Sequence, residues 1–202
     1  MRNNTPTLAD RHRLVILDLD GTLYNKKGLS RRMVLHAPWY ILRMHAERKT
    51  RAEMKGIWLG EHFCQTYNKR MAECMHCSEA EAKVWYEQHY MPLMVRIIGK
   101  YQRLNEWVIP FLEACKERSV KIVVLSDYGH AKEKLQALGL DTQVFDWVVS
   151  ASELGGLKPA AELMHVVTER MGVSATECLV IGDREDTDGE MAHKTSAEFW
   201  RV

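Results

Sequence analysis

The chain has 202 residues, 46% of them hydrophobic and 27% charged, a balance typical of a globular domain or of a core domain with an insertion. Its 28 Lys and Arg residues against 27 Asp and Glu residues leave a formal net charge of +1, which gives no support to nucleic-acid or membrane binding. No apolar run approaches the roughly 18 residues that cross a bilayer, and the polar start M-R-N-N-T-P lacks the apolar stretch of a secretory signal. We therefore expect a cytoplasmic protein.

The first predicted element is a strand over residues 13–18 that ends in paired carboxylates. Its apolar run, L-V-I-L, is short and continuous, which is typical of a strand buried on both faces of a parallel sheet. Asp18 and Asp20 follow, and Gly21 turns the chain. Ligands bind at the carboxyl edge of such sheets, so both aspartates are candidate functional residues. The alternative is a plain carboxylate–glycine turn after a core strand.

Residues 25–104 differ in composition, being rich in Met, Trp, Arg, His and Glu and poor in the alternation typical of strands. Amphipathic spacing and capping signals predict one or two helices over residues 30–54, helices over 61–75 and 79–90, and a further helix up to Tyr101. We expect a bend near Pro38, a break or restart near Pro92, and a capping box from Ser78 and Glu81. These features predict an all-helical domain over residues 25–104, inserted after the first strand.

A cluster of possible zinc ligands lies in this insertion and consists of Cys64, Cys74, His76 and Cys77. A C-x-x-C pair with a nearby cysteine and histidine is a candidate zinc site. Structural zinc sites usually combine two paired ligand groups, and only one pair is present, so uncoordinated thiols are the favoured interpretation. The chain has five cysteines, and an odd number is typical of reduced thiols in a cytoplasmic protein.

Basic residues of the insertion are candidates for contact with an anionic leaving group. They are Arg31, Arg32, Arg43, Arg48 and Lys49. A solvated helix face is the favoured interpretation for most of them. The residues of the insertion that contact a substrate are therefore left open at this point.

After residue 105 the chain alternates between strand and helix patterns. Strands are predicted over residues 120–125, 145–150, 178–183 and 197–202. Alternation of this kind produces a parallel sheet with right-handed crossovers. We predict an α/β fold: a Rossmann-like three-layer core with a parallel five-stranded sheet, formed by residues 1–24 and 105–202.

Polar residues follow the later strands as well. Ser126 follows the second strand, Lys158 lies in the loop after the third, and Asp183 ends the fourth. Because the ends of parallel strands share one edge, these residues are expected to converge with Asp18 and Asp20. Carboxylates at close quarters repel one another unless a hard cation such as Mg²⁺ joins them. A lysine ammonium and a serine hydroxyl are suited to holding a phosphate group.

In order and strand context, these residues resemble the motifs of the haloacid dehalogenase-like superfamily, in its phosphatase branch. The motifs are D-L-D-G-T at 18–22, V-V-L-S at 123–126, L-K-P around Lys158, and I-G-D-R-E-D-T-D with Asp183 and Asp188. The resemblance covers about residues 1–24 and 105–202. The segment 25–104 is similar in position alone, because related enzymes insert a helical cap there.

The resemblance implies a role for each matched residue. Asp18 is similar to the nucleophile that forms an aspartyl-phosphate, and Asp20 to the general acid and base. Ser126 and Lys158 would hold the transferring phosphoryl group. Dehalogenases of the superfamily lack the second aspartate, so the presence of Asp20 favours phosphoryl chemistry. Asp127, which follows Ser126, is a candidate for substrate contact or for capping of its own loop.

The resemblance also implies a Mg²⁺ site. Its ligands would be the carboxylates of Asp18 and Asp183 and the backbone carbonyl of Asp20. Asp188 would be a further ligand or a residue that orients one. Asp186 fits the family pattern less well and is expected to be a solvated residue at a helix start.

The function implied is a Mg²⁺-dependent phosphatase that hydrolyses a small phosphorylated metabolite through an aspartyl-phosphate. A sugar phosphomutase would use the same aspartates, and a non-catalytic binding protein on the same fold is the alternative from another class. The expected partner is a small-molecule phosphate ester, with no nucleic acid and no membrane. Monomer and homodimer both stay open.

Overall fold

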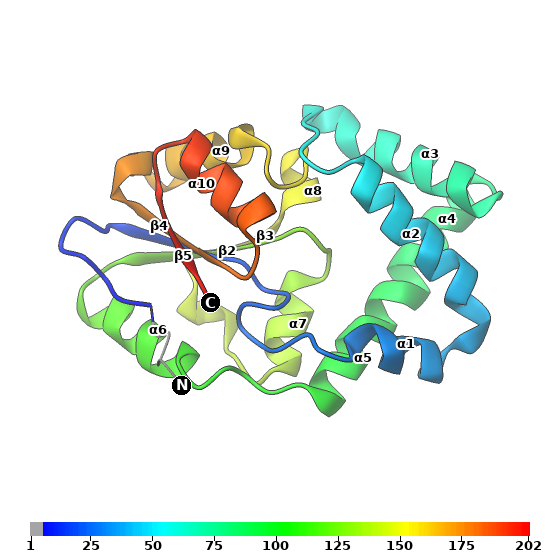
Figure 1. Ribbon diagram of the computed structural model, residues 1–202, viewed down its shortest axis with the longest axis horizontal. Coiled ribbons are helices and arrows are strands. Elements are labelled where there is room, and N and C mark those ends of the chain that lie inside the picture. Colours follow the sequence, from blue (N-terminus) through cyan, green and yellow to red (C-terminus); the bar gives the residue numbers. More distant parts are fainter. Residues whose placement is uncertain (1–5) are drawn as a thin grey trace.

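The computed structural model describes residues 6–202, and the first five residues of the predicted core segment 1–24 lie outside this part. All five predicted strands form one parallel sheet in the order β3-β2-β1-β4-β5 (Figure 1). The strands are β1 (Leu14–Leu17), β2 (Lys121–Ser126), β3 (Trp147–Ser150), β4 (Cys178–Gly182) and β5 (Glu198–Arg201). Strand β1 lies at the centre and pairs with β2 on one side and β4 on the other. The predicted parallel sheet is therefore confirmed.

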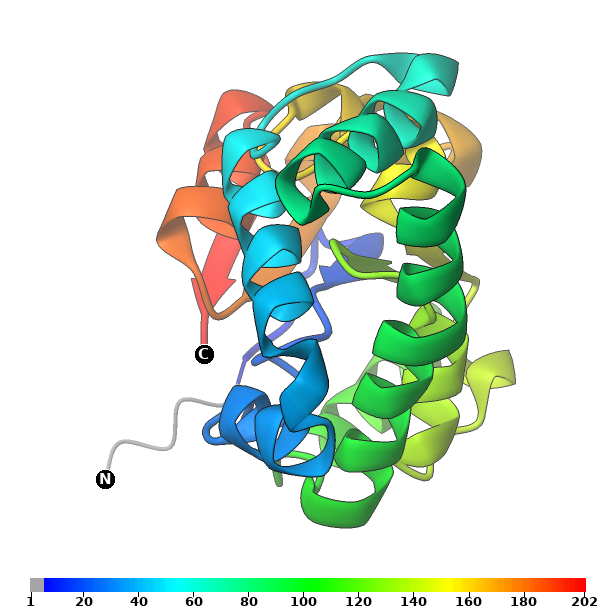
Figure 2. The ribbon, with the colours of Figure 1, turned by 90° about the vertical axis from the view of Figure 1, so that its right-hand side faces the viewer.

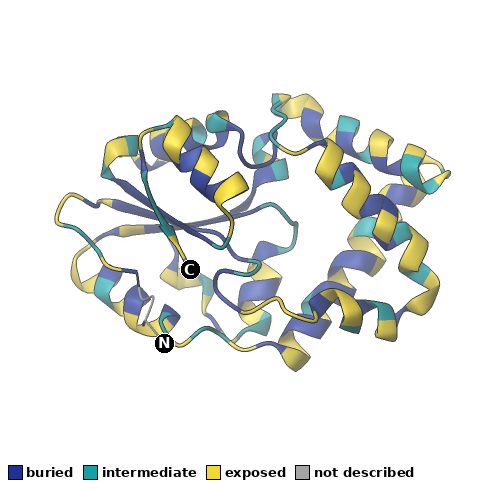
Figure 3. Cartoon of the chain, viewed as in Figure 1, coloured by how far each residue is buried: buried dark blue, intermediate teal, exposed yellow. Residues whose placement is uncertain are grey.

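Both faces of the sheet are covered by helices. The core helices are α6 (Val108–Glu117), α7 (Ala131–Ala137), α8 (Ala151–Leu154), α9 (Ala161–Met171) and α10 (Glu190–Lys194). Val15 and Leu17 of β1 pack in one apolar cluster with α6 and α7, and Leu14 and Ile16 pack in a second cluster with α9 and α10. Figure 3 shows the buried residues along the strands and on the helix faces that meet them. This arrangement confirms the three-layer core.

Residues 25–104, all of which the structure describes, form helices and no strand. The α-helices are α1 (Leu29–His36), α2 (Ile41–Glu53), α3 (Phe63–Met75), α4 (Glu79–Trp85) and α5 (Met91–Tyr101), with short helical turns at Pro38–Tyr40, Gly60–His62 and Tyr86–Tyr90. The bend at Pro38 is confirmed, as is the capping box, in which Glu81 N donates to Ser78 Oγ at 3.2 Å and Ser78 N to Glu81 Oε2 at 3.1 Å. The helical nature of the insertion is therefore confirmed.

Pro92 restarts the helix without separating its two parts. A π-helical turn at Tyr86–Tyr90 joins α4 directly to α5, and Pro92 stands in the first turn of α5. Proline clashes with the carbonyl four residues earlier in a regular α-helix, and a wider π turn accommodates it. The sequence pattern detects the proline but not this local widening.

The insertion lies across the carboxyl ends of the strands (Figures 1 and 2). Its two connections to the core run side by side, because Tyr24 and Leu104 form an antiparallel bridge. On the other side, Trp58 bridges to Gly156 of the core, and Leu59 N donates to Gly155 O at 2.9 Å. The division into a core of 1–24 and 105–202 and a cap of 25–104 stays a prediction. Within residues 6–202, every helix is too short or too polar to serve as a membrane span.

Candidate active site

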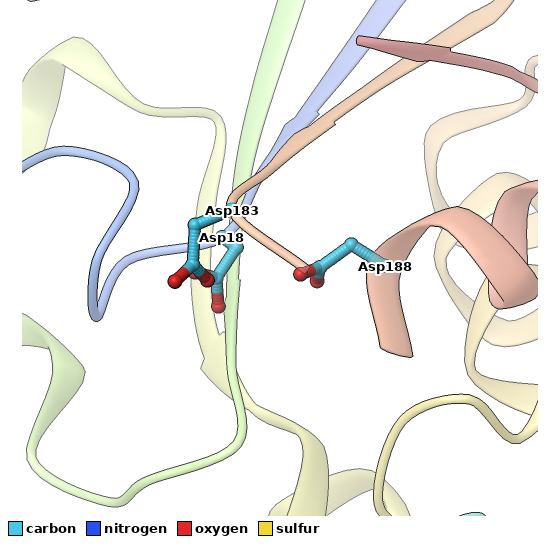
Figure 4. Close-up of side chains that lie close together, drawn as sticks. All are labelled: Asp18, Asp183 and Asp188. Carbon is cyan, nitrogen blue, oxygen red and sulfur yellow. The ribbon is translucent and has the colours of Figure 1, made fainter. Parts of the chain in front are cut away.

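Three carboxylates meet at the carboxyl ends of β1 and β4. Oxygens of Asp18, Asp183 and Asp188 lie within 4.8 Å of one another, and residues 6–202 contain no second group of three such ligands. Figure 4 shows Asp18 and Asp183 side by side and Asp188 pointing toward them from the turn after β4. Asp18 and Asp188 are buried, at 8% and 2% exposure. The predicted convergence of these aspartates is thus present in the structure.

Lys158 joins two of these carboxylates. Its Nζ donates to Asp18 Oδ1 at 2.7 Å and to Asp188 Oδ1 at 2.6 Å, and also to the Leu125 carbonyl at 3.2 Å. Burial disfavours the ammonium, but Asp18 and Asp188 outweigh that cost and hold the pKa of Lys158 above its ordinary value. The sequence-predicted lysine therefore lies directly beside the predicted nucleophile.

The cluster carries more negative charge than Lys158 balances. Burial raises the pKa of Asp188 to about 7, Lys158 opposes this rise, and the neighbouring Asp18 carboxylate adds to it. A carboxyl group whose ionisation is resisted by burial and by a like charge is one that a divalent cation would stabilise in its ionised form. The donor set, which is entirely oxygen, matches the preference of Mg²⁺.

Lys26 marks the position of a cation on the outer side of the cluster. Its ammonium lies 2.6 Å from Asp183 Oδ2 and donates to the Asp20 backbone carbonyl at 3.1 Å. Gly21 has a φ of 110°, and a Cβ on this residue would lie 2.6 Å from Asp183 Oδ2. The two oxygens expected to bind Mg²⁺ therefore face one shared space that is attractive to a positive charge. The residues present fit the metal that the sequence predicts.

Asp20 is held by three hydrogen-bond donors. Tyr24 donates to Asp20 Oδ1 at 2.6 Å, while Ser126 Oγ at 3.1 Å and Lys134 Nζ at 2.7 Å both donate to Oδ2. Burial raises the pKa of Asp20, but the Lys134 ammonium and the three hydrogen bonds outweigh it and hold the pKa below its usual value. Ser126, predicted to bind phosphate, contacts the predicted acid–base residue in this state.

Lys134 was not predicted from the sequence to be a functional residue, although its position in the helix pattern is unusual for a lysine. It lies on the same face of α7 as Ala131 and Leu135, where an apolar residue is expected. Its side chain has no exposed surface, and its ammonium also lies 4.9 Å from the centre of the Tyr128 ring. A lysine at a core position of a helix indicates a buried anionic partner, which here is Asp20.

We expect Lys134→Met to lower the free energy of unfolding by about 3–5 kcal/mol, because removing one partner of a buried ion pair leaves the other charge uncompensated. The Asp20 side chain is only 10% exposed, so water replaces the ammonium poorly. Urea denaturation monitored by circular dichroism would measure the change. The double variant Asp20→Asn/Lys134→Met should regain most of the loss, and a simple sum of the two single effects would contradict the ion-pair explanation.

A second charged group links the insertion to the core. Arg51 of α2 donates through Nη1 to the Asp127 carbonyl at 2.6 Å, and its guanidinium lies 3.8 Å from the centre of the Tyr128 ring. Glu47 is buried and accepts from Arg51 Nη2 at 2.5 Å. The same carboxylate accepts from two tyrosines of the insertion, at 3.0 Å and 3.2 Å. Helix α2 is therefore fastened to the loop after β2.

Two other groups of residues named from the sequence lie outside the acidic cluster. No three of Cys64, Cys74, His76 and Cys77 come close enough to hold a metal, although all four are among the described residues. Asp186 is exposed, forms an ion pair with Lys55 and accepts from Arg184 Nε at 3.0 Å, as expected of a solvated residue outside the acidic cluster.

The sequence model of the haloacid dehalogenase-like hydrolases matches residues 12–194. A curated relative, N-acylneuraminate-9-phosphatase of Homo sapiens, is 27% identical over 192 residues, which cover 88% of this chain and 77% of the relative. Protein SUPPRESSOR OF QUENCHING 1, chloroplastic, of Arabidopsis thaliana is 26% identical over 176 residues and 84% of this chain. The matched part is only 16% of that protein's length.

Solved structures agree on the fold. A structure described as a predicted phosphoglycolate phosphatase from Haemophilus somnus superposes with a TM-score of 0.62 and 20% identity, over 95% of this chain and 85% of that one. A dehalogenase in an intermediate complex superposes equally, with a TM-score of 0.62 and 19% identity, over 96% and 86%. Because phosphatases and dehalogenases share the fold, it does not separate the two reactions. The match of the sequence model over nearly the whole chain establishes that this protein belongs to the haloacid dehalogenase-like hydrolases.

Proposed function

We propose that this chain is a Mg²⁺-dependent phosphatase that hydrolyses a small phosphate monoester through an aspartyl-phosphate on Asp18. The observation that carries the proposal is the pair formed by Asp18 and Asp20 at one strand end. Asp18 lies in the acidic cluster beside Lys158, and Asp20 lies outside that cluster among three donors. Two neighbouring carboxylates in different environments are suited to different roles. The phosphatase name of the human relative supports the same reaction class.

In the first step, an Asp18 carboxylate oxygen attacks phosphorus and the bond to the ester oxygen breaks. The Lys158 ammonium, 2.7 Å from Asp18 Oδ1, is placed to balance charge on the phosphoryl oxygens. Asp20 gives its proton to the leaving oxygen. The contacts with Lys134 and Ser126 favour ionised Asp20, so we propose that the incoming phosphate dianion raises its pKa and supplies the protonated form.

In the second step, Asp20 accepts a proton from water, and the resulting hydroxide attacks phosphorus. The bond between phosphorus and the Asp18 oxygen breaks, inorganic phosphate leaves, and both aspartates are regenerated. A divalent cation held by the carboxylates of Asp18, Asp183 and Asp188 and the Asp20 carbonyl would supply charge neutralisation for these groups. Lys26 now lies in the space beside Asp183 that such a cation would share with it.

The direct test is phosphate release from p-nitrophenyl phosphate and from a panel of phosphorylated metabolites. We expect turnover with Mg²⁺, background rates with EDTA, and recovery when Mg²⁺ is restored in excess. A readout independent of turnover is thermal stability, because a cation that binds only the folded state at 100 times its Kd stabilises by about 2.7 kcal/mol. The Asp183→Asn variant should lose most of this stabilisation.

Three outcomes would redirect the proposal. Full activity in EDTA would remove the metal from the mechanism. Isomerisation of a sugar phosphate, dependent on a bisphosphate and faster than phosphate release, would replace the phosphatase with a phosphomutase. An absence of any phosphate release, with Mg²⁺ still bound, would favour a binding protein on this fold.

A further inference from the structure

A cavity of about 260 Å³ lies between helix α2 of the insertion and the strand ends of the core. Five cations line it, Arg48, Arg51 and Lys55 from the insertion and Lys158 and Arg184 from the core, against one acidic lining residue, Asp127. Lys158 contacts Asp18, so one end of the cavity lies next to the predicted nucleophile. The volume is slightly below the range of ligand pockets, about 300–1,000 Å³, and suits a ligand of a few heavy atoms.

Two of the five cations are already balanced. Arg51 is paired with the buried Glu47, and its guanidinium is engaged by the Asp127 carbonyl. Lys158 is shared between Asp18 and Asp188. These two residues therefore add little net positive charge for a second anion beyond the phosphoryl group.

The other three cations carry excess charge. Lys55 and Arg184 share a single carboxylate, that of Asp186. Arg48 is exposed, and among the residues that the structure describes it has neither an ion pair nor a hydrogen bond. Three cations against two carboxylates, those of Asp186 and of the lining residue Asp127, leave one positive charge at this part of the wall. Such a surface attracts anions and is unfavourable for a cationic group.

We propose that this cavity binds a second anionic group of the substrate, so that the preferred esters carry a carboxylate or a further phosphate on a short leaving group. The inference rests on the proposed phosphatase function and deepens it. The phosphoryl group binds at Lys158, and the second anion extends toward Arg48, Lys55 and Arg184. An arginine fork matches the planar oxygens of either anion. The basic residue of the insertion that meets the leaving group is then Arg48.

Three esters built on one two-carbon skeleton test the proposal. Phosphoglycolate carries a carboxylate, ethylene glycol monophosphate carries a hydroxyl in its place, and ethylene glycol bisphosphate carries a second phosphate. We expect kcat/KM for at least one of the two anionic esters to exceed that for the hydroxyl ester by roughly 10-fold or more, the size of a hydrogen bond to a charged group. Comparing kcat/KM for phosphoglycolate with that for the bisphosphate then shows which of the two anions the cavity prefers. Phosphoethanolamine, which carries an ammonium group in place of the hydroxyl, should be the poorest substrate.

Arg48→Ala should lower kcat/KM for the preferred anionic ester by roughly 10-fold and leave the hydroxyl ester within about twofold. Lys49→Ala is the matched control, because Lys49 is the next residue of α2, is exposed, pairs with Glu53 and lines no part of the cavity. Arg48→Glu should reverse the preference between phosphoglycolate and the hydroxyl ester. An equal effect of Arg48→Ala on all esters would overturn the proposal.

Measuring ligand binding in an inactive variant tests the anion site separately from the phosphatase function on which it rests. In the Asp18→Asn variant, calorimetric titration should give a lower Kd for the preferred anionic ester than for the hydroxyl ester, and adding Arg48→Ala should remove the difference. Turnover without any preference would overturn the anion site alone. Selective binding by a chain that releases phosphate from no ester would overturn the phosphatase alone and support the anion site.

Discussion

Replacing Asp18 with asparagine is expected to reduce kcat for phosphate release by at least about 10⁴-fold, the scale seen when a covalent nucleophile is removed. The amide is neutral and a far weaker nucleophile, so no phosphorylated intermediate forms. Steady-state turnover of p-nitrophenyl phosphate would measure the loss. Mass spectrometry of acid-quenched protein should detect a phosphoryl adduct in the native chain and none in the variant.

The same substitution should leave the fold in place. Asparagine is nearly isosteric, and Lys158 keeps its ion pair with Asp188 at 2.6 Å. Asp10→Asn is a suitable control, since Asp10 is a surface residue that pairs with Arg118 away from the acidic cluster. Retention of more than a tenth of the native activity by Asp18→Asn, with the fold intact, would exclude Asp18 as the nucleophile.

Asp20→Asn is expected to reduce turnover by about 10²–10⁴-fold, the usual contribution of a general acid or base. The two steps should respond differently to the leaving group. A nitrophenolate leaves without a proton, so formation of the intermediate should be spared and its breakdown slowed. An alkyl ester needs the proton, so both steps should slow.

Rapid mixing with p-nitrophenyl phosphate should therefore show a burst of nitrophenolate in Asp20→Asn, followed by a slow steady state. An alkyl ester should show no burst of the released alcohol. The Asp20→Asn/Lys134→Met variant controls for the buried ammonium that the single change leaves next to a neutral amide. An unchanged rate of breakdown of the intermediate would remove Asp20 from the acid–base role.

The sheet and the acidic cluster were predictable because both depend on local pattern plus one topological rule. Continuous apolar runs mark buried parallel strands, and their carboxyl ends share an edge. Asp18 and Asp183 end neighbouring strands in the register Leu17 opposite Ile181, so their convergence follows directly. The position of Asp188 depends on the conformation of the turn after β4, so this residue was predicted only through the resemblance to the family motifs.

The side chains that contact Asp20, and the contacts that attach the insertion to the core, could not be predicted because they join residues distant in sequence. Lys134 lies 114 residues from Asp20, and Arg51 lies 76 residues from Asp127. Helical spacing reveals that Lys134 faces the core, but not which carboxylate it meets. The same limit applies to Arg48, because the next residue, Lys49, is also basic and only the assembled cavity separates the two.

The antiparallel bridge between Tyr24 and Leu104 has a mechanical consequence. Both chain segments that connect the insertion to the core pass through this point, so we expect a rotation of the insertion relative to the sheet to pivot there once its contacts at Trp58 and Arg51 are released. Tyr24 is fully buried, and its hydroxyl donates to Asp20 at 2.6 Å. The pivot and the acid–base residue therefore share one side chain. We therefore expect a movement of the insertion about this axis to alter the hydrogen bonding of Asp20 as well.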